Sequence, residues 1–232
     1  MDNTKLDVRV YPIDEPKGSS LAFASVTIDD LVAIRGVRVV NGEKGLFVAM
    51  PQSQDNKGIY HDIAFPLSGD VRKAISDAVL SEYQWKASLV PEQRGYEKPE
   101  HGAANGRGAS DAKLNIKVFP IAEPKGDTLA FASVGLNDVA AIRGIRVMDS
   151  DKGLFVAMPQ SKDKEGNSHD VAFPLNGDLR RRISKAIIGE YKHMTAEKKQ
   201  SIGDRLSDGA EKSAAYVAQP RDAAKRAPGL GD

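Results

Sequence analysis

Residues 6–26 read LDVRVYPIDEPKGSSLAFASV, and residues 114–134 read LNIKVFPIAEPKGDTLAFASV. The two copies keep this register without a gap as far as Tyr83 and Tyr191. A repeat of roughly eighty residues is too long for one supersecondary unit and is about the size of a small domain. The sequence therefore predicts two copies of one domain, and any function must account for the pair.

Each copy is predicted to begin with an antiparallel sheet. Apolar residues alternate at Leu6, Val8 and Val10, which is the period of a strand with one buried face. The turn Glu15-Pro16-Lys17-Gly18 places proline and glycine where a type I turn favours them, so we expect a hairpin. In the first copy, further strands are expected at residues 21–26, 32–40, 46–50 and 59–65.

One helix is predicted to follow the sheet in each copy. Ser68-Gly69-Asp70 offers capping residues and a carboxylate for the positive end of a helix. An apolar stripe with helical spacing then appears in both copies. Its residues are Val71, Ile75, Ala78 and Val79 in the first copy and Leu179, Ile183, Ala186 and Ile187 in the second. This stripe should pack on one face of the sheet.

The inner strands are apolar at consecutive positions, so we expect both faces of the sheet to be covered. The second face is left for the other copy or for a second chain, because large exposed apolar patches are uncommon. The predicted class is α+β, with two tandem copies of a small antiparallel sheet domain that has one C-terminal helix. The two copies are expected to pack as a pseudo-dimer.

Composition changes mark the expected boundaries. We assign residues 1–90 and 113–194 to the two domains, and residues 91–112 to a flexible linker rich in glycine, alanine and charge. Residues 195–232 are mainly small and polar, so we expect a disordered tail there that can form a transient helix.

Overall composition bounds the class of protein. The chain of 232 residues is 41% hydrophobic with a net charge of +1, which is typical of a globular protein. It has no cysteine, so disulfides and thiolate metal sites are excluded. The start lacks signal-peptide features and no apolar run reaches the length of a membrane span, so we expect a cytoplasmic protein without membrane contact.

Three short blocks in each copy resemble a known family. They are GLFVAMP, D-[IV]-A-F-P-L and R-x-x-I-S-x-A-[VI]-[LI]-x-E-Y. Their joint occurrence in order, twice, resembles the stage V sporulation protein G family, the septation regulators of bacteria. The resemblance implies a small α+β domain that forms homodimers, binds DNA and RNA, and regulates septation, sporulation and gene expression.

The chain departs from that family in ways that bear on its partners. Two domains in one chain could pair internally in place of a homodimer. The family's histidine before the second proline is replaced by Phe65 and Phe173, and its Ser-Lys after Met-Pro becomes Gln-Ser in both copies.

Nucleic-acid binding requires cations presented together toward phosphates, and the helix starts supply them. The first copy has Arg72 and Lys73, while the second copy has Arg180, Arg181, Arg182 and Lys185. In the second copy, helical spacing lets three of these cations share one surface. Asp77 stands in the first copy where the second has Lys185, and should neutralise that patch. The second copy, with eleven Lys and Arg against ten Asp and Glu, is the expected anion binder; the first has eight against eleven.

A second interpretation of these cations is a solvated helix face paired with local acids. Weaker candidates for nucleic-acid contacts lie in turns and strands, where an arginine commonly serves as an ion-pair partner over the sheet. They are Lys17, Lys125, Arg35, Arg143, Arg38 and Arg146. No motif for base readout is present, so contacts mainly to phosphates are expected, with DNA or RNA as the partner.

The sequence also bears on two other classes of function, an enzyme and an interaction scaffold. His61-Asp62 and His169-Asp170 could serve an enzyme, but neighbouring strand residues point to opposite faces, so we expect no catalysis, metal or cofactor. The other class is a protein-interaction scaffold in cell division or sporulation control, with the tail capturing a protein partner.

Overall fold

The computed structural model describes residues 4–55, 57–89, 112–162 and 165–217, with side chains in the last helix described up to Glu197. The chain divides into two compact units, Met1–Tyr191 and Lys192–Asp232. The first unit contains both copies of the repeat. The predicted linker at 91–112 lies almost wholly outside the described residues.

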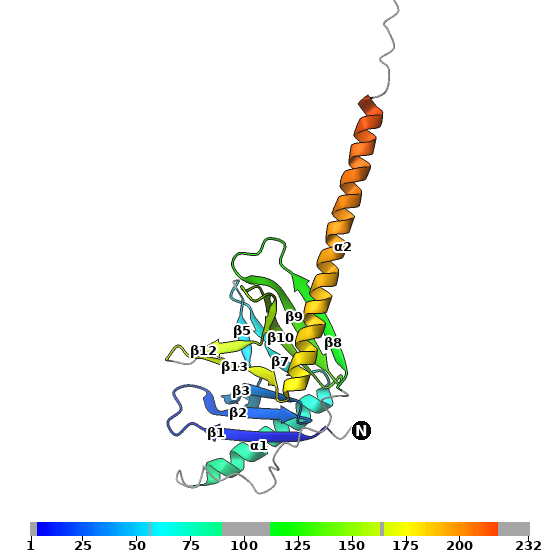
Figure 1. The fold of residues 1–232 in the computed structure, drawn as a ribbon. Coiled ribbons are helices and arrows are strands. Elements are labelled where there is room, and N and C mark those ends of the chain that lie inside the picture. Colours follow the sequence, from blue (N-terminus) through cyan, green and yellow to red (C-terminus); the bar gives the residue numbers. More distant parts are fainter. Residues whose placement is uncertain (1–3, 56, 90–111, 163–164, 218–232) are drawn as a thin grey trace, which may run out of the picture. The chain divides into compact units, whose positions relative to one another are not determined.

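Both copies fold into strands followed by one helix, as the sequence predicts (Figure 1). The first copy contains β1 (Leu6–Pro12), β2 (Ser20–Ile28), β3 (Val32–Gly42), β4 (Gly45–Ala49), β5 (Gln52–Gln54), β6 (Tyr60–Asp62), β7 (Ala64–Pro66) and α1 (Gly69–Ser88). The second copy contains β8 (Leu114–Pro120), β9 (Thr128–Leu136), β10 (Ala140–Met148), β11 (Phe155–Ala157), β12 (Gln160–Lys162), β13 (Ser168–Asp170), β14 (Ala172–Pro174) and α2 (Gly177–Val217).

Two tight connections build the sheet of each copy. β1 and β2 pair antiparallel from Leu6 opposite Ile28 to Pro12 opposite Ala22, which confirms the predicted hairpin. The next turn was not predicted. Asp29 and Asp30 have φ angles of 51° and 53°, as in a type I′ turn, and these small polar residues tolerate that left-handed backbone.

The two copies are joined by an exchange of strands. β7 of the first copy pairs with β10 of the second, and β14 of the second copy pairs with β3 of the first. Each large sheet therefore holds a short strand from the other copy. The strand predicted over 59–65 is really two strands, because β6 pairs with β5 while β7 crosses to the other copy. This exchange is how the predicted pseudo-dimer forms.

One face of each sheet carries the hydrophobic core. Helix α1 packs on β1 and its neighbours, with Ile75 and Val79 fully buried. Ile183 and Ile187 are the corresponding buried residues of α2. The predicted helix stripe is thus confirmed at these positions, and Leu179 at its start in the second copy is also fully buried.

The other copy does not cover the opposite face of each sheet, and the predicted alternative of a second chain stays a prediction. Tyr11 and Phe23 in the first copy, and Phe119 and Phe131 in the second, remain about half exposed on this face. The consecutive apolar runs have another cause, because they mark where the two copies meet. Residues 31–34 are buried one after another next to β14, and residues 140–142 are buried next to β7.

Helix α2 continues beyond the second copy. It extends to Val217, so residues 195–217 of the expected tail are helical. The segment has no proline before Pro220 and contains four alanines and three lysines, which favour helices. Residues 218–232 lie outside the described part. Within the described residues, no helix is both long and apolar enough to cross a membrane.

Candidate nucleic-acid interface

Side-chain caps fix where each helix begins. The amide of Val71 donates to Ser68 Oγ at 3.2 Å, which confirms the predicted cap. In the second copy, the amide of Asp178 donates to Asn176 Oδ1 at 2.7 Å. These caps satisfy amides that have no partner within the helix, and they set the positions from which the candidate cations project.

The cations of the first helix start are held by acids. Lys73 Nζ lies 2.6 Å from Asp77 Oδ2, one helical turn away, and this contact raises the pKa of Lys73. Arg72 Nη2 lies 3.8 Å from Asp62 Oδ2. The expectation that Asp77 neutralises this patch agrees with its contact to Lys73.

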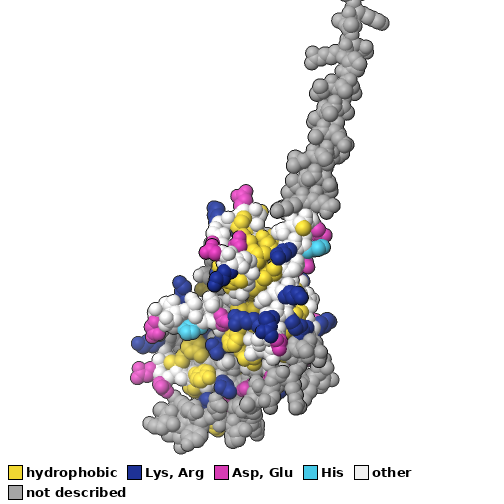
Figure 2. All heavy atoms as spheres, viewed as in Figure 1, with side chains coloured by type: hydrophobic (Ala, Val, Ile, Leu, Met, Phe, Trp, Pro, Cys, Tyr) yellow, Lys and Arg dark blue, Asp and Glu magenta, His cyan; other side chains and the backbone are white. Residues whose placement is uncertain are grey.

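The four cations of the second helix start are less uniform than predicted. Arg180 Nη2 lies 3.2 Å from Asp170 Oδ2, and Arg181 pairs with Asp178. Arg182 is half-buried and donates to the carbonyl of Ala112 at 2.9 Å, while Lys185 is exposed. Figure 2 shows Lys and Arg side chains gathered where α2 begins in Figure 1.

One arginine in each copy links the start of the helix to an aspartate of a short hairpin. Asp62 accepts a hydrogen bond from Gln52 Nε2 at 2.8 Å as well as its contact with Arg72. Asp170 has the same two partners in the second copy, Gln160 and Arg180. Arg72 and Arg180 thus tie a helix start to a short hairpin. Arg181 and Lys185 are both exposed and lie one helical turn apart on α2.

The weaker candidates fall into three places. Lys17 and Lys125 are exposed in the β1–β2 and β8–β9 turns. Arg38 and Arg146 lie on β3 and β10 as the cross-strand partners of Phe23 and Phe131, respectively. Arg35 and Arg143 sit where the pairing register shifts.

The register shift is a β-bulge that aims an arginine at the other copy. Gly144 has a φ of 72° beside Arg143, a backbone that glycine adopts without strain. The amide of Arg143 donates to the carbonyl of Ile63 at 2.7 Å, and its guanidinium carbon lies 4.5 Å from the centre of the Phe65 ring. The first copy repeats this with Arg35 over Phe173, at 4.8 Å. Both arginines thus have an aromatic partner rather than the expected ion pair.

The aromatic residues on the open sheet faces were not among the residues predicted to bind. Phe119 is the cross-strand partner of Phe131, and Arg146 is opposite Phe131 on the next strand, so the three side chains form one row. Tyr11, Phe23 and Arg38 make the corresponding row of the first copy. The signal in the sequence was an aromatic residue at an outward position of each hairpin strand, next to inward Val118 and Ala130.

His61, on which the enzyme hypothesis depends in the first copy, has a local partner. His61 Nε2 lies 2.9 Å from Asp55 Oδ2, and this hydrogen bond lowers the pKa of Asp55. Asp62, the neighbour of His61, belongs to the separate contact with Gln52 and Arg72. The His and Asp of this dipeptide therefore do not converge on one point. Among the described residues, no group of three or more His, Asp or Glu side chains could hold a metal ion.

Comparison with known proteins gives the family. The SpoVG family model matches residues 3–85 and 112–193, which are the two copies. A protein of Heliobacterium modesticaldum named as a SpoVG septation protein is 47% identical over 81 residues, covering 35% of this chain and 90% of its own. A namesake from Myxococcus xanthus is 41% identical over 78 residues, covering 34% of this chain and 77% of its own. A third protein of this name, from Agathobacter rectalis, is 40% identical over 84 residues, covering 36% of this chain and 95% of its own.

Each of these relatives matches about one copy of the repeat, while the family model matches both copies. The chain therefore belongs to the SpoVG septation protein family and carries the family's domain twice.

Proposed function

We propose that this protein is a regulator that binds DNA or RNA mainly through phosphate contacts. The observation that carries the proposal is the pair Arg181 and Lys185 at the start of α2. The two residues are one helical turn apart and both are exposed, so their charges can face one polyanion. Membership of a septation protein family supports a regulatory role rather than a metabolic one.

The acid next to Arg181 does not remove this capacity. Arg181 and Asp178 are both largely exposed, and a surface ion pair of this kind contributes no more than about 1 kcal/mol. A phosphate can therefore replace Asp178 as the partner of Arg181. In the first copy, Asp77 occupies the position equivalent to Lys185, so an acid replaces a cation there and that helix start is the weaker anion site.

The test is a titration of labelled single-stranded and duplex oligonucleotides at about 50 and 200 mM salt. We expect binding that weakens steeply with salt. The variant R181A/K185A should bind more weakly and lower the salt slope for duplex by about 2. The matched control is K73A, which removes a cation from the helix start where Asp77 stands in place of Lys185, and it should change the slope little.

Two results would refute the proposal. One is no binding to either oligonucleotide at low salt, which would favour the scaffold interpretation. The other is a salt slope for R181A/K185A equal to that of the unaltered protein.

A further inference from the structure

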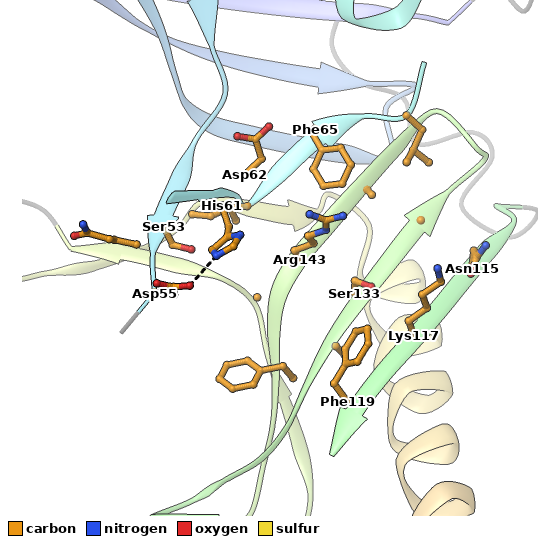
Figure 3. Close-up of a pocket in the computed structure, with 18 of the residues that line it drawn as sticks. Ser53, Asp55, His61, Asp62, Phe65, Asn115, Lys117, Phe119, Ser133 and Arg143 are labelled. Carbon is orange, nitrogen blue, oxygen red and sulfur yellow. Dashed lines mark hydrogen bonds and ion pairs between the residues drawn. The ribbon is translucent and has the colours of Figure 1, made fainter. Parts of the chain in front are cut away.

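The open face of the second copy's sheet is hollowed beside the exchanged strand. The hollow has a volume of about 790 Å³ and is lined by β8, β9 and β10 together with residues of the first copy. Figure 3 shows Lys117, Phe119 and Ser133 projecting from the sheet, with Arg143 and Phe65 at the junction of the two copies. Both copies thus contribute to one concave surface.

Aromatic rings form part of this surface without serving the core. Phe119 is 57% exposed and Phe131 is 47% exposed, whereas their inward neighbours Val118 and Ala130 are buried. Because Phe119 and Phe131 are cross-strand partners, their rings lie side by side on one face. Exposed aromatic residues on a sheet are platforms on which unpaired bases can stack.

Cations border the rings. Lys117 is two residues from Phe119 on the same strand, so both side chains project from the same face. Arg146 flanks Phe131 on the neighbouring strand, and Arg143 is held over the Phe65 ring. Among the described residues, neither Lys117 nor Arg146 has an ion pair.

The acids that line the hollow already have partners. Asp138 pairs with Lys113 Nζ at 2.7 Å, and Asp55 pairs with His61. The third acid is Asp62, which is contacted by Gln52 and Arg72 as described above. The charge left for a ligand is therefore positive, which complements a phosphate backbone.

The first copy has the same row of side chains but a poorer surface. Its hollow is smaller, about 500 Å³, and Asp7 occupies the position of Asn115, which adds a negative charge. Lys86 Nζ also lies 5.7 Å from the centre of the Tyr11 ring, so that ring already has a cationic partner. The second copy is thus the better platform.

We propose that this open face of the second copy binds the bases of single-stranded nucleic acid. Phe119 and Phe131 stack with successive bases, while Lys117, Arg143 and Arg146 contact the phosphates. The inference rests on the proposed function and adds a second contact surface to the helix start. Duplex bases are already stacked on one another, so only unpaired bases can use the rings.

The test measures affinity for short oligothymidine and oligoadenosine strands and for a duplex of equal length. Replacing Phe119 or Phe131 by alanine should weaken single-strand binding by about 5- to 150-fold and leave the salt slope unchanged. Duplex binding by these variants should stay within about twofold of the unaltered protein. Lys117→Ala should instead lower the single-strand salt slope by about 0.7.

Controls separate this inference from the proposed function. Because both rings are half exposed, circular dichroism and the melting temperature should show that the alanine variants fold, and Phe23→Ala in the first copy should lose less affinity. Unchanged single-strand affinity of F119A/F131A overturns the inference alone if R181A/K185A still weakens binding. Absence of all binding at low salt overturns both. A change of solution mass in F119A/F131A without a change of affinity would show instead that the face joins two chains.

Discussion

Replacing Ile142 by alanine tests whether the exchanged strands make the two copies one folding unit. Ile142 is fully buried on β10, and its cross-strand partner is Ala64 of β7 from the first copy. Truncating a buried isoleucine to alanine costs about 2–5 kcal/mol. For a unit of about 150–250 residues, 1 kcal/mol lowers the melting temperature by about 2–4 °C, so we expect a fall of about 4–20 °C.

The chain contains one probe that reports the first copy alone. Trp85 is its only tryptophan and lies on α1, whereas the altered residue is in the second copy. Tryptophan fluorescence therefore follows the first copy, while far-ultraviolet circular dichroism follows both. If the exchanged strands couple the copies, Ile142→Ala lowers both transitions by the same amount.

The control is Phe131→Ala, which removes a half-exposed ring from the same sheet and should shift both transitions by only a few degrees. The reasoning would be refuted by a tryptophan transition that stays at the original temperature while circular dichroism shows an earlier one. That result would mean that each copy unfolds alone, despite the strand it receives from the other.

Two further predictions concern single positions. His61→Ala, which removes the hydrogen-bond donor, should raise the pKa of Asp55 toward 3.8, and the stability from this contact should be present above that pH and be lost as the pH falls below it. Titration of the Asp55 carboxyl by NMR checks this, and an unchanged pKa would contradict it. Gly144→Ala should lower the free energy of unfolding by about 1–2 kcal/mol, because its φ of 72° disfavours a side chain even though Pro159 is 3.7 Å from the added carbon. The control Gly189→Ala, in a helix with open space around it, should raise that free energy by about 0.5–1 kcal/mol in denaturant titrations, and equal effects of the two changes would refute the account.

The local structure of each copy was largely predictable from the sequence. Alternating residues gave the first hairpin, and the helical stripe gave α1 and the start of α2, because each signal depends on near neighbours in the chain. The exchanged strand was not predictable in the same way. The run around Ala64 fits a strand in either sheet, and its partner on β10 is set by packing between distant parts of the chain.

The candidate site was only partly predictable for the same reason. Spacing on a helix indicated that Arg181 and Lys185 could share a surface, but it could not show that Arg182 turns to the carbonyl of Ala112. The aromatic row required the register between β8 and β9. Phe119 and Phe131 are separated by a turn in the sequence and become neighbours only through that pairing.

The differences between the copies point in one direction at two separate places. At the helix start, Asp77 of the first copy corresponds to Lys185 of the second, and on the open sheet face Asp7 corresponds to Asn115. Each change makes the second copy less negative next to a surface that we propose meets nucleic acid. None of these four residues belongs to the buried core, so packing does not require either difference between the copies. The two copies of the repeat are also not structurally independent, because the exchanged strand of the first copy supplies Phe65 to the hollow of the second copy. The first copy is thus part of the second copy's proposed site, so the proposed binding would depend on it despite its weaker anion surface.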